Sequence, residues 1–159
     1  FSGTIDSNIR YGKEAATEAE VQRAAEIAQA WDFIEEKEDG VQSAIAQGGT
    51  NVSGGQKQRL SIARAIAKNQ EIYIFDDSFS ALDYKTDVVL RRALKKETKD
   101  ATTLIVAQRI STILHADKIL VLDEGHVVGQ GTHKELLKSC DVYRQIAMSQ
   151  LSEEELADE

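Results

Sequence analysis

The sequence of 159 residues contains no proline, a single cysteine and only three histidines. The lone Cys140 excludes an internal disulfide and fits a reducing compartment. One cysteine and three scattered histidines do not supply the ligand spacing of a zinc site. No apolar run is long enough to cross a bilayer, and residues 1–20 lack the basic start and apolar block of a signal peptide. The absence of proline and the opening on Phe1 lead us to expect a piece of a longer chain.

Acidic residues outnumber basic ones, and the formal net charge is −8. This charge argues against general nucleic-acid binding, which needs basic surface to neutralise phosphates. Hydrophobic residues make up 42% and charged residues 29% of the chain, a composition typical of soluble globular proteins. Part of the negative charge lies in residues 151–159, which we expect to form an acidic, disordered tail.

Apolar residues at helical spacing predict helices, and short apolar runs predict strands. Residues 17–34 read as one helix that begins with a capping box from Thr17 to Glu20. "IYIF" (72–75) and "TTLIVA" (102–107) read as strands buried on both faces, as in a parallel sheet. Two further strands are expected around a turn at Glu124–Gly125. The remaining expected helices are 52–67, 86–98, 110–116, 132–140 and 141–151. This alternation predicts an α/β fold.

The stretch "VSGGQ" opens the helix of residues 52–67. Gly54 and Gly55 let the backbone approach a ligand closely, and the helix N-terminus presents N–H groups to an anion. Ser53 adds a hydroxyl donor. The spacing from Ser53 to Gln56 is equally that of a capping box with no ligand, and the stretch alone does not decide between the two.

Two consecutive carboxylates, Asp76 and Asp77, follow the apolar strand "IYIF". Ligands of open α/β sheets bind at the carboxyl ends of the strands, so Asp76 is a candidate ligand for Mg²⁺ and Asp77 a neighbour of a reacting phosphate. The alternative is that both acids only end the strand and cap the next helix. Repulsion between adjacent acids weakens that alternative, because a nearby cation would relieve it.

Taken together, these stretches resemble the ATP-binding cassette (ABC) ATPase family. "VSGGQKQRLSIARAIA" is similar to the family signature, "IYIFDD" to the Walker B strand, "SALD" (Ser80 to Asp83) to the D-loop and "TTLIVAQR" to the switch strand. The resemblance covers nearly the whole chain and implies ATP and Mg²⁺ as ligands. It implies that Ser53, Gly54, Gly55 and Gln56 complete the ATP site of a second nucleotide-binding domain, with Ser80 and Asp83 in the D-loop, and that Asp76 binds the metal.

The chain departs from the family pattern in three places. No G-x-x-x-x-G-K-[ST] sequence occurs, so the loop that cradles phosphates is absent from this sequence. Asp77 stands where active members usually have a catalytic glutamate, and Gln108 where they usually have a histidine. Glutamine donates a hydrogen bond but cannot carry a proton or positive charge. We therefore expect a degenerate site in one half of a heterodimeric multidrug exporter.

The expected fold is α/β: a partial RecA-like core with a parallel sheet, lacking its N-terminal strands, plus a helical subdomain. Residues 1–68 would form mainly the helical subdomain and residues 69–150 the C-terminal part of the core. The expected function is that of an ATPase subunit at the cytoplasmic face of the cell membrane, attached to a transmembrane domain. The alternatives are a non-transport ABC ATPase, of the translation-factor or chromosome type, and a regulatory ATP-binding module without turnover.

Overall fold

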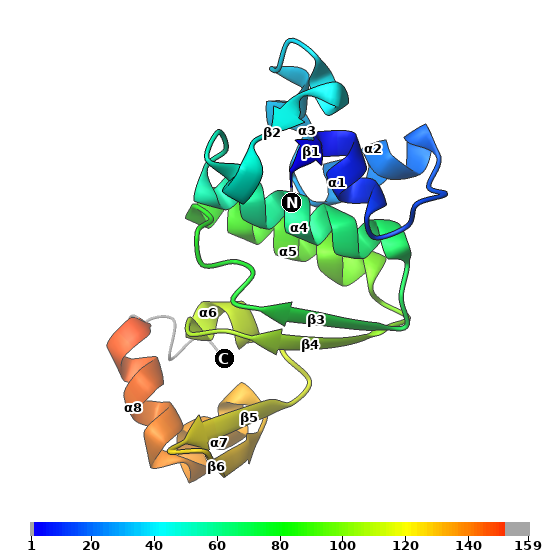
Figure 1. Ribbon diagram of the computed structural model, residues 1–159. Coiled ribbons are helices and arrows are strands. Elements are labelled where there is room, and N and C mark those ends of the chain that lie inside the picture. The colour runs from blue at the N-terminus through cyan, green and yellow to red at the C-terminus, as the bar shows by residue number, and fades with distance from the viewer. Residues whose placement is uncertain (1, 152–159) are drawn as a thin grey trace. The chain divides into compact units, whose positions relative to one another are not determined.

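The computed structural model describes residues 2–151. The chain divides into two compact units, Phe1–Val106 and Ala107–Glu159 (Figure 1). Each unit has its own apolar core. The acidic tail predicted for residues 151–159 lies outside the described residues, apart from Leu151.

The first unit contains a helical part and a short parallel sheet. Its strands are β1 (Gly3–Thr4), β2 (Ala44–Ile45), β3 (Ile72–Asp76) and β4 (Thr102–Val106). Its α-helices are α1 (Ile5–Arg10), α2 (Glu18–Ile27), α3 (Trp31–Glu35), α4 (Gly54–Lys68) and α5 (Tyr84–Glu97), with two 3₁₀ turns, η1 (Gly40–Gln42) and η2 (Gln47–Gly49). β3 pairs with β4 in parallel, and β1 pairs with β2 in antiparallel fashion. Both short strands and both 3₁₀ turns went unpredicted.

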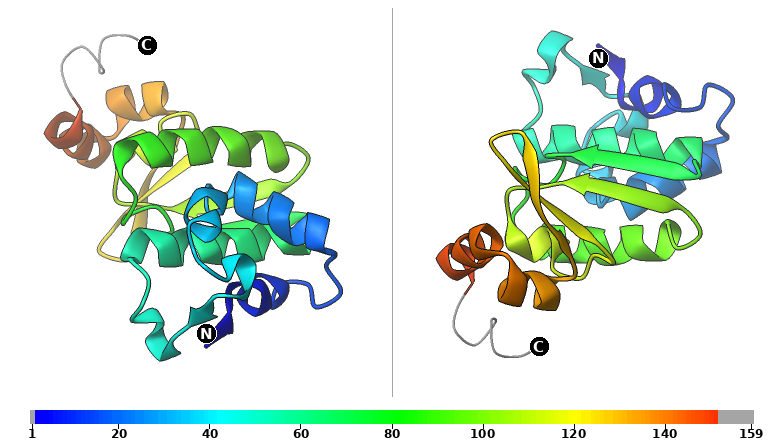
Figure 2. Two further views of the ribbon diagram at one scale, coloured as in Figure 1. Left: turned by 90° about the horizontal axis from the view of Figure 1, so that it is seen from above. Right: turned by 90° about the horizontal axis from the view of Figure 1, so that it is seen from below.

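The sheet of β3 and β4 is covered on one face by α4 and α5 (Figure 2). Tyr73 and Phe75 point into the core, where they join Leu60 of α4 and Leu90 of α5. The opposite face carries exposed apolar side chains, of which Ile74 is 66% exposed. The prediction that both strands are buried on both faces is therefore wrong within the described residues. Alternation of buried and exposed positions along β3 shows a sheet with one covered face.

The helix predicted over residues 17–34 is two helices, because the chain turns sharply between α2 and α3. Gln29 adopts a left-handed conformation, with φ of 55°. The carbonyl oxygen of Gln29 accepts a hydrogen bond of 2.6 Å from Arg59 of α4. The apolar residues of 17–34 still face one core, with Val21, Ala24 and Ile34 buried. Helical spacing therefore predicted the buried face correctly and missed the break.

The second unit is a β-hairpin packed with short helices. It consists of α6 (Ile110–Ile113), β5 (Ile119–Asp123), β6 (His126–Gly131), α7 (His133–Ser139) and α8 (Asp141–Gln150). The predicted turn at Glu124–Gly125 is confirmed, and both residues have positive φ. Leu136 and Tyr143 lie in the core of this unit, where the Tyr143 hydroxyl is 2.8 Å from Nδ1 of His133.

The capping box predicted at Thr17 is present, and its Glu20 carboxylate also binds the ammonium group of Lys13. The amide of Thr17 donates to Glu20 at 2.7 Å, and Lys13 Nζ lies 2.6 Å from the other carboxylate oxygen. The hydrogen bond from Lys13, followed by that from the Thr17 amide, lowers the pKa of Glu20 from 4.5 to about 2. The ionised carboxylate is therefore the form that the folded state favours.

The stability of the chain, measured as a function of pH, should show the contribution of the Glu20 carboxylate. Because the folded-state pKa of Glu20 is lowered, its stabilisation is present above 4.5 and is lost as the pH falls through about 2. Glu20→Gln should therefore lower the urea midpoint of the 159-residue chain near pH 6, and the difference from the parent should shrink towards pH 2. Glu14→Gln serves as a control, since Glu14 has no hydrogen bond or ion pair among the described residues. An equal effect of Glu20→Gln at both ends of the titration would contradict the assignment.

Candidate functional site

The N-terminus of α4 is built by the predicted capping box. The amide of Gln56 donates to Ser53 Oγ at 3.1 Å, and the amide of Ser53 donates to Gln56 Oε1 at 3.0 Å. Within the described residues, the amides of Gly54 and Gly55 donate no hydrogen bond to the chain. Since the Ser53 hydroxyl accepts from Gln56, its own hydrogen can still be donated outward. These groups form a set of donors at the positive end of a helix of 15 residues.

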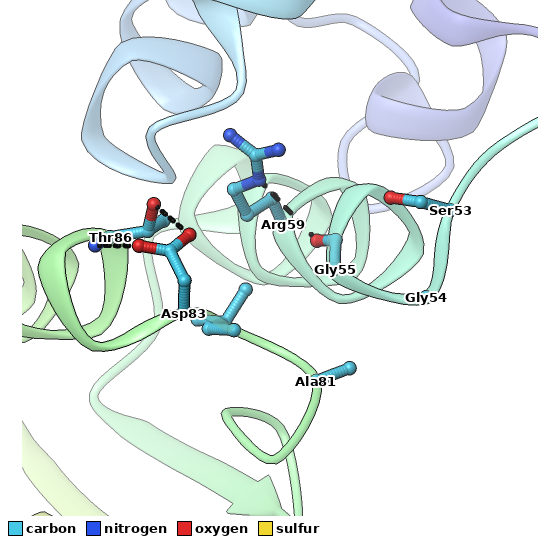
Figure 3. Close-up of a pocket in the computed structure, with 8 residues that line it drawn as sticks. Ser53, Gly54, Gly55, Arg59, Ala81, Asp83 and Thr86 are labelled. Atoms are coloured by element: carbon cyan, nitrogen blue, oxygen red, sulfur yellow. Dashed lines mark hydrogen bonds between the residues drawn. The ribbon is translucent and has the colours of Figure 1, made fainter.

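A turn of residues 77–83, which we call the β3–α5 turn, packs directly against this helix end. A Cβ atom on Gly55 would lie 2.9 Å from the carbonyl oxygen of Ala81, so only glycine fits there without a shift. A Cβ on Gly54 would lie 3.4 Å from Ala81 Cβ, close to ordinary contact. The helix and the turn enclose a hollow of about 340 Å³ (Figure 3). Its lining residues are Ser53, Gly54, Gly55, Arg59, Ala81, Leu82, Asp83 and Thr86.

Asp83 and Arg59 bring opposite charges to the rim of this hollow. Asp83 caps α5, since its carboxylate accepts from Thr86 Oγ1 at 2.6 Å and from the Thr86 amide at 2.9 Å. These two hydrogen bonds lower the pKa of Asp83. Burial lowers the pKa of the Arg59 guanidinium, while the Asp83 charge acts in the opposite direction. Arg59 also lies over the ring of Phe33, 4.8 Å from its centroid, which fixes its position.

The two carboxylates that end β3 differ in their contacts. Asp76 is the last residue of β3, and its exposed carboxylate has no hydrogen bond or ion pair among the described residues. Asp77 lies just beyond, with a left-handed φ of 47°. One oxygen of the Asp77 carboxylate accepts a hydrogen bond of 3.1 Å from Ser80 Oγ. Asp77 is therefore tied to its own turn, whereas Asp76 is available to a cation.

Gln108 lies in the second unit. It is exposed, in the segment between β4 and α6. Its carbonyl oxygen accepts a hydrogen bond of 2.9 Å from Gln150 of α8. The other candidate residues, namely Ser53, Gly54, Gly55, Gln56, Asp76, Asp77, Ser80 and Asp83, all lie in the first unit.

Residues 3–80 match the family model described as "ABC transporter". An ABC transporter ATP-binding protein of Mycobacterium tuberculosis is 47% identical over 153 residues, which are 94% of this chain and 26% of that protein. A Staphylococcus aureus protein described as a multidrug export ATP-binding/permease protein is 47% identical over 146 residues, which are 92% and 25% of the two chains. A bacterial Atm1-family ABC exporter solved with ATP bound superposes with a TM-score of 0.92 at 39% identity, over 96% of this chain and 27% of that one.

The chain is part of an ABC transporter ATP-binding domain. It spans about a quarter of the length of the curated relatives that it matches. The predicted α/β class is confirmed, as a mixed α/β chain that matches an ABC ATPase domain. Among residues 2–151, no helix is long and apolar enough to cross a membrane.

The residues fit the two ligands that the family implies. For ATP, the open amides of Gly54 and Gly55 and the Ser53 hydroxyl suit phosphate oxygens, and the hollow beside them is large enough for a phosphate group. For Mg²⁺, the residues that the structure describes contain no cluster of three acidic, histidine or cysteine ligands. Mg²⁺ does not need such a cluster, since it keeps several waters and binds one or two carboxylates with substrate phosphates. The free carboxylate of Asp76 fits that pattern.

Sequence reasoning missed several residues of this site. Gln58 and Arg59 were assigned no role, although they follow Gly54 and Gly55 by four residues and therefore share their face of α4. Thr86 also lines the hollow, three residues after its partner Asp83. Helical spacing from the two glycines would have found the first pair, and the cap spacing would have found Thr86.

Proposed function

We propose that this chain is part of the nucleotide-binding subunit of an ABC exporter, coupling ATP binding and hydrolysis to export across a membrane. The observation that carries the proposal is the helix end at Ser53, whose unengaged Gly54 and Gly55 amides face a hollow suited to phosphate. The match to an ATP-bound exporter supports it. Such a subunit works at the cytoplasmic face of the membrane, with a transmembrane domain and a second nucleotide-binding domain as partners.

In this proposal the helix end serves an ATP molecule held by the partner domain. The Ser53 hydroxyl and the amides of Gly54 and Gly55 donate to phosphate oxygens, and the capping residue Gln56 keeps the Ser53 backbone in place. The donors are already oriented, so they stabilise developing negative charge without reorganisation. The RecA-like division of the chain, with residues 1–68 as helical subdomain and 69–150 as core, belongs to the same proposal.

The chain's own site is proposed to bind ATP and hydrolyse it poorly. Asp76 would hold Mg²⁺, which neutralises phosphate charge when bound. Asp77 is one methylene shorter than glutamate, and its carboxylate accepts a hydrogen bond from Ser80 within its own turn. Gln108 can donate a hydrogen bond to phosphate but not a proton. The subunit would then pair with a different, competent subunit in a heterodimer for multidrug export. A regulatory module without turnover is the second candidate, favoured by Asp77 and Gln108 alone.

The direct test is the ATPase rate of the full-length subunit, measured alone and with its partner subunit. Turnover that appears only with the partner supports the heterodimer proposal. Full turnover by the subunit alone would contradict the degenerate site, and no turnover in either case would favour the regulatory module.

The isolated 159-residue chain should show no ATP turnover above the rate of a buffer blank. The reason is that its sequence contains no G-x-x-x-x-G-K-[ST] loop, the loop whose backbone amides cradle the phosphates of a bound nucleotide. A malachite-green phosphate assay at saturating Mg·ATP measures this. The control is the same chain with Asp76→Asn, and turnover by the parent that this substitution removes would contradict the prediction.

A further inference from the structure

The side chain of Gln58 joins α4 to the β3–α5 turn at three points. Its Nε2 donates to the carbonyl oxygen of Asp77 at 3.0 Å and lies 3.0 Å from Ser80 Oγ, which accepts. Its Oε1 accepts from the amide of Ala81 at 2.9 Å. One side chain therefore holds the first, fourth and fifth residues of a turn that lies 19 to 23 residues further along the chain.

Only a carboxamide of this length makes all three contacts. The Ala81 amide can only donate and the Asp77 carbonyl can only accept, so these two partners fix which end of the Gln58 amide faces each. Glutamate would keep the contact to Ala81 and lose both donated bonds. An apolar side chain would lose all three and leave the turn's polar groups to solvent.

The contacts reach the backbone of Asp77, the residue that stands in place of a catalytic glutamate. Asp77 is held at a φ of 47°, a conformation that costs a non-glycine residue free energy and persists only where its surroundings enforce it. Gln58 binds the carbonyl of Asp77, and Ser80 Oγ lies between Gln58 and the Asp77 carboxylate. The direction of the Asp77 carboxylate therefore depends on Gln58.

The same side chain stands one turn after the two glycines of the phosphate-facing helix end. Gln58 follows Gly54 by four residues and Gly55 by three, so it shares their face of α4. Ala81 contacts both ends of this arrangement, because its carbonyl lies against Gly55 and its amide binds Gln58. The helix end and the turn cannot shift independently without breaking these contacts.

We propose that Gln58 is a positioning residue that couples the two ATP sites of the dimer within this one chain. It ties the helix end that serves the partner's ATP to the turn that orients Asp77 in the chain's own site. This inference rests on the proposed function, because it needs Ser53–Gly55 and Asp77 to act in two different sites. Gln58 does not line the hollow itself, so it acts through the turn and not by touching ATP.

The test uses the full-length subunit assembled with its partner and compares Gln58→Ala with the control Gln70→Ala. Gln70 is an exposed glutamine just after α4, and among the described residues its side chain donates one hydrogen bond, to the carbonyl of Lys68. In Gln58→Ala we expect kcat to fall about tenfold, because the variant loses a few hydrogen bonds of modest strength. The KM for ATP should stay within about twofold of the parent. Gln70→Ala should leave both unchanged.

Two further measurements separate positioning from a purely structural role. Ser80→Ala should add little to the kcat loss of Gln58→Ala, because both residues act through one network. Amide hydrogen exchange at Ala81 should be faster in Gln58→Ala and unchanged in Gln70→Ala. Parental kcat in Gln58→Ala, additive losses with Ser80→Ala, or unchanged exchange at Ala81 would each overturn the inference. If the parent assembly does not hydrolyse ATP, the proposed function fails, and the exchange at Ala81 still decides whether Gln58 holds the turn.

Discussion

Gly55→Asp in the full-length subunit is expected to lower the ATPase rate of the assembled transporter about 10²-fold. Two physical reasons add to each other. A Cβ at this position would lie 2.9 Å from the carbonyl oxygen of Ala81, so the helix end and the β3–α5 turn must separate. The new carboxylate would also place negative charge among donors that face phosphate, where it repels the ligand. The measurement is steady-state phosphate release with both subunits present.

Gly125→Asp is the matched control for this experiment. It makes the same change of side chain and charge, but a Cβ on Gly125 meets nothing within 4 Å, and the residue lies in the β5–β6 turn of the second unit. Aspartate tolerates the positive φ found there better than most residues. We expect the control to keep the parental rate. Parental turnover in Gly55→Asp, with ATP binding intact, would show that the start of α4 is not part of an ATP site.

The local elements of this fold were largely predictable because they follow from short-range patterns. The capping-box spacings at Thr17 and Ser53 are both formed in the structure, and α2 and α4 begin directly after these two residues. The break at Gln29 was not predictable from periodicity, because it depends on Arg59, a residue 30 positions further on that binds the Gln29 carbonyl. Apolar periodicity records which residues face a core and says little about where the backbone turns between them.

Burial of the strands could not be inferred for a similar reason. The run "IYIF" is apolar throughout, which is typical of a strand covered on both faces, yet Ile72 is 63% exposed in the first unit. The apolar composition of a strand reflects all the surfaces that pack against it in the functional protein. Sequence therefore predicted the strand and its end at Asp76, while the cover on each face depends on packing partners that a local pattern does not specify.

The sequence predicted the motifs of the candidate site, but it did not predict the contacts between them. Ser53, Gly54 and Gly55 follow from the requirement that backbone amides face an anion at a helix start. Their closeness to Asp83 and Ala81 depends on how the β3–α5 turn folds back onto α4, a contact between segments about 26 residues apart. Helical spacing places Gln58 on the same face of α4 as the two glycines, but its contacts with the β3–α5 turn became visible only through its three partners.

The second large effect is expected in the ATP site that we propose for this chain, when Asp77 and Gln108 are both replaced by the residues usual in active family members. In a transporter whose partner site has been inactivated, Asp77→Glu with Gln108→His should raise turnover about 10²-fold over the parent. Glutamate restores the missing methylene, and histidine can carry the positive charge and proton that glutamine cannot. Asp77→Glu alone should give only part of this gain, because Gln108 remains. Single-turnover hydrolysis of radiolabelled ATP measures each variant.

A matched control shows whether the gain is specific to the proposed asymmetric pair of sites. Asp123→Glu adds the same methylene to another exposed aspartate that ends a strand, β5, and should change nothing. Full restoration by Asp77→Glu alone would mean that the residue at 108 does not limit hydrolysis. No gain in the double variant would mean that the site is limited elsewhere. The hydrogen bond from Ser80 would then be the first contact to test. It holds the carboxylate of residue 77 within its own turn, and a glutamate must break this hydrogen bond to reach the attacking water.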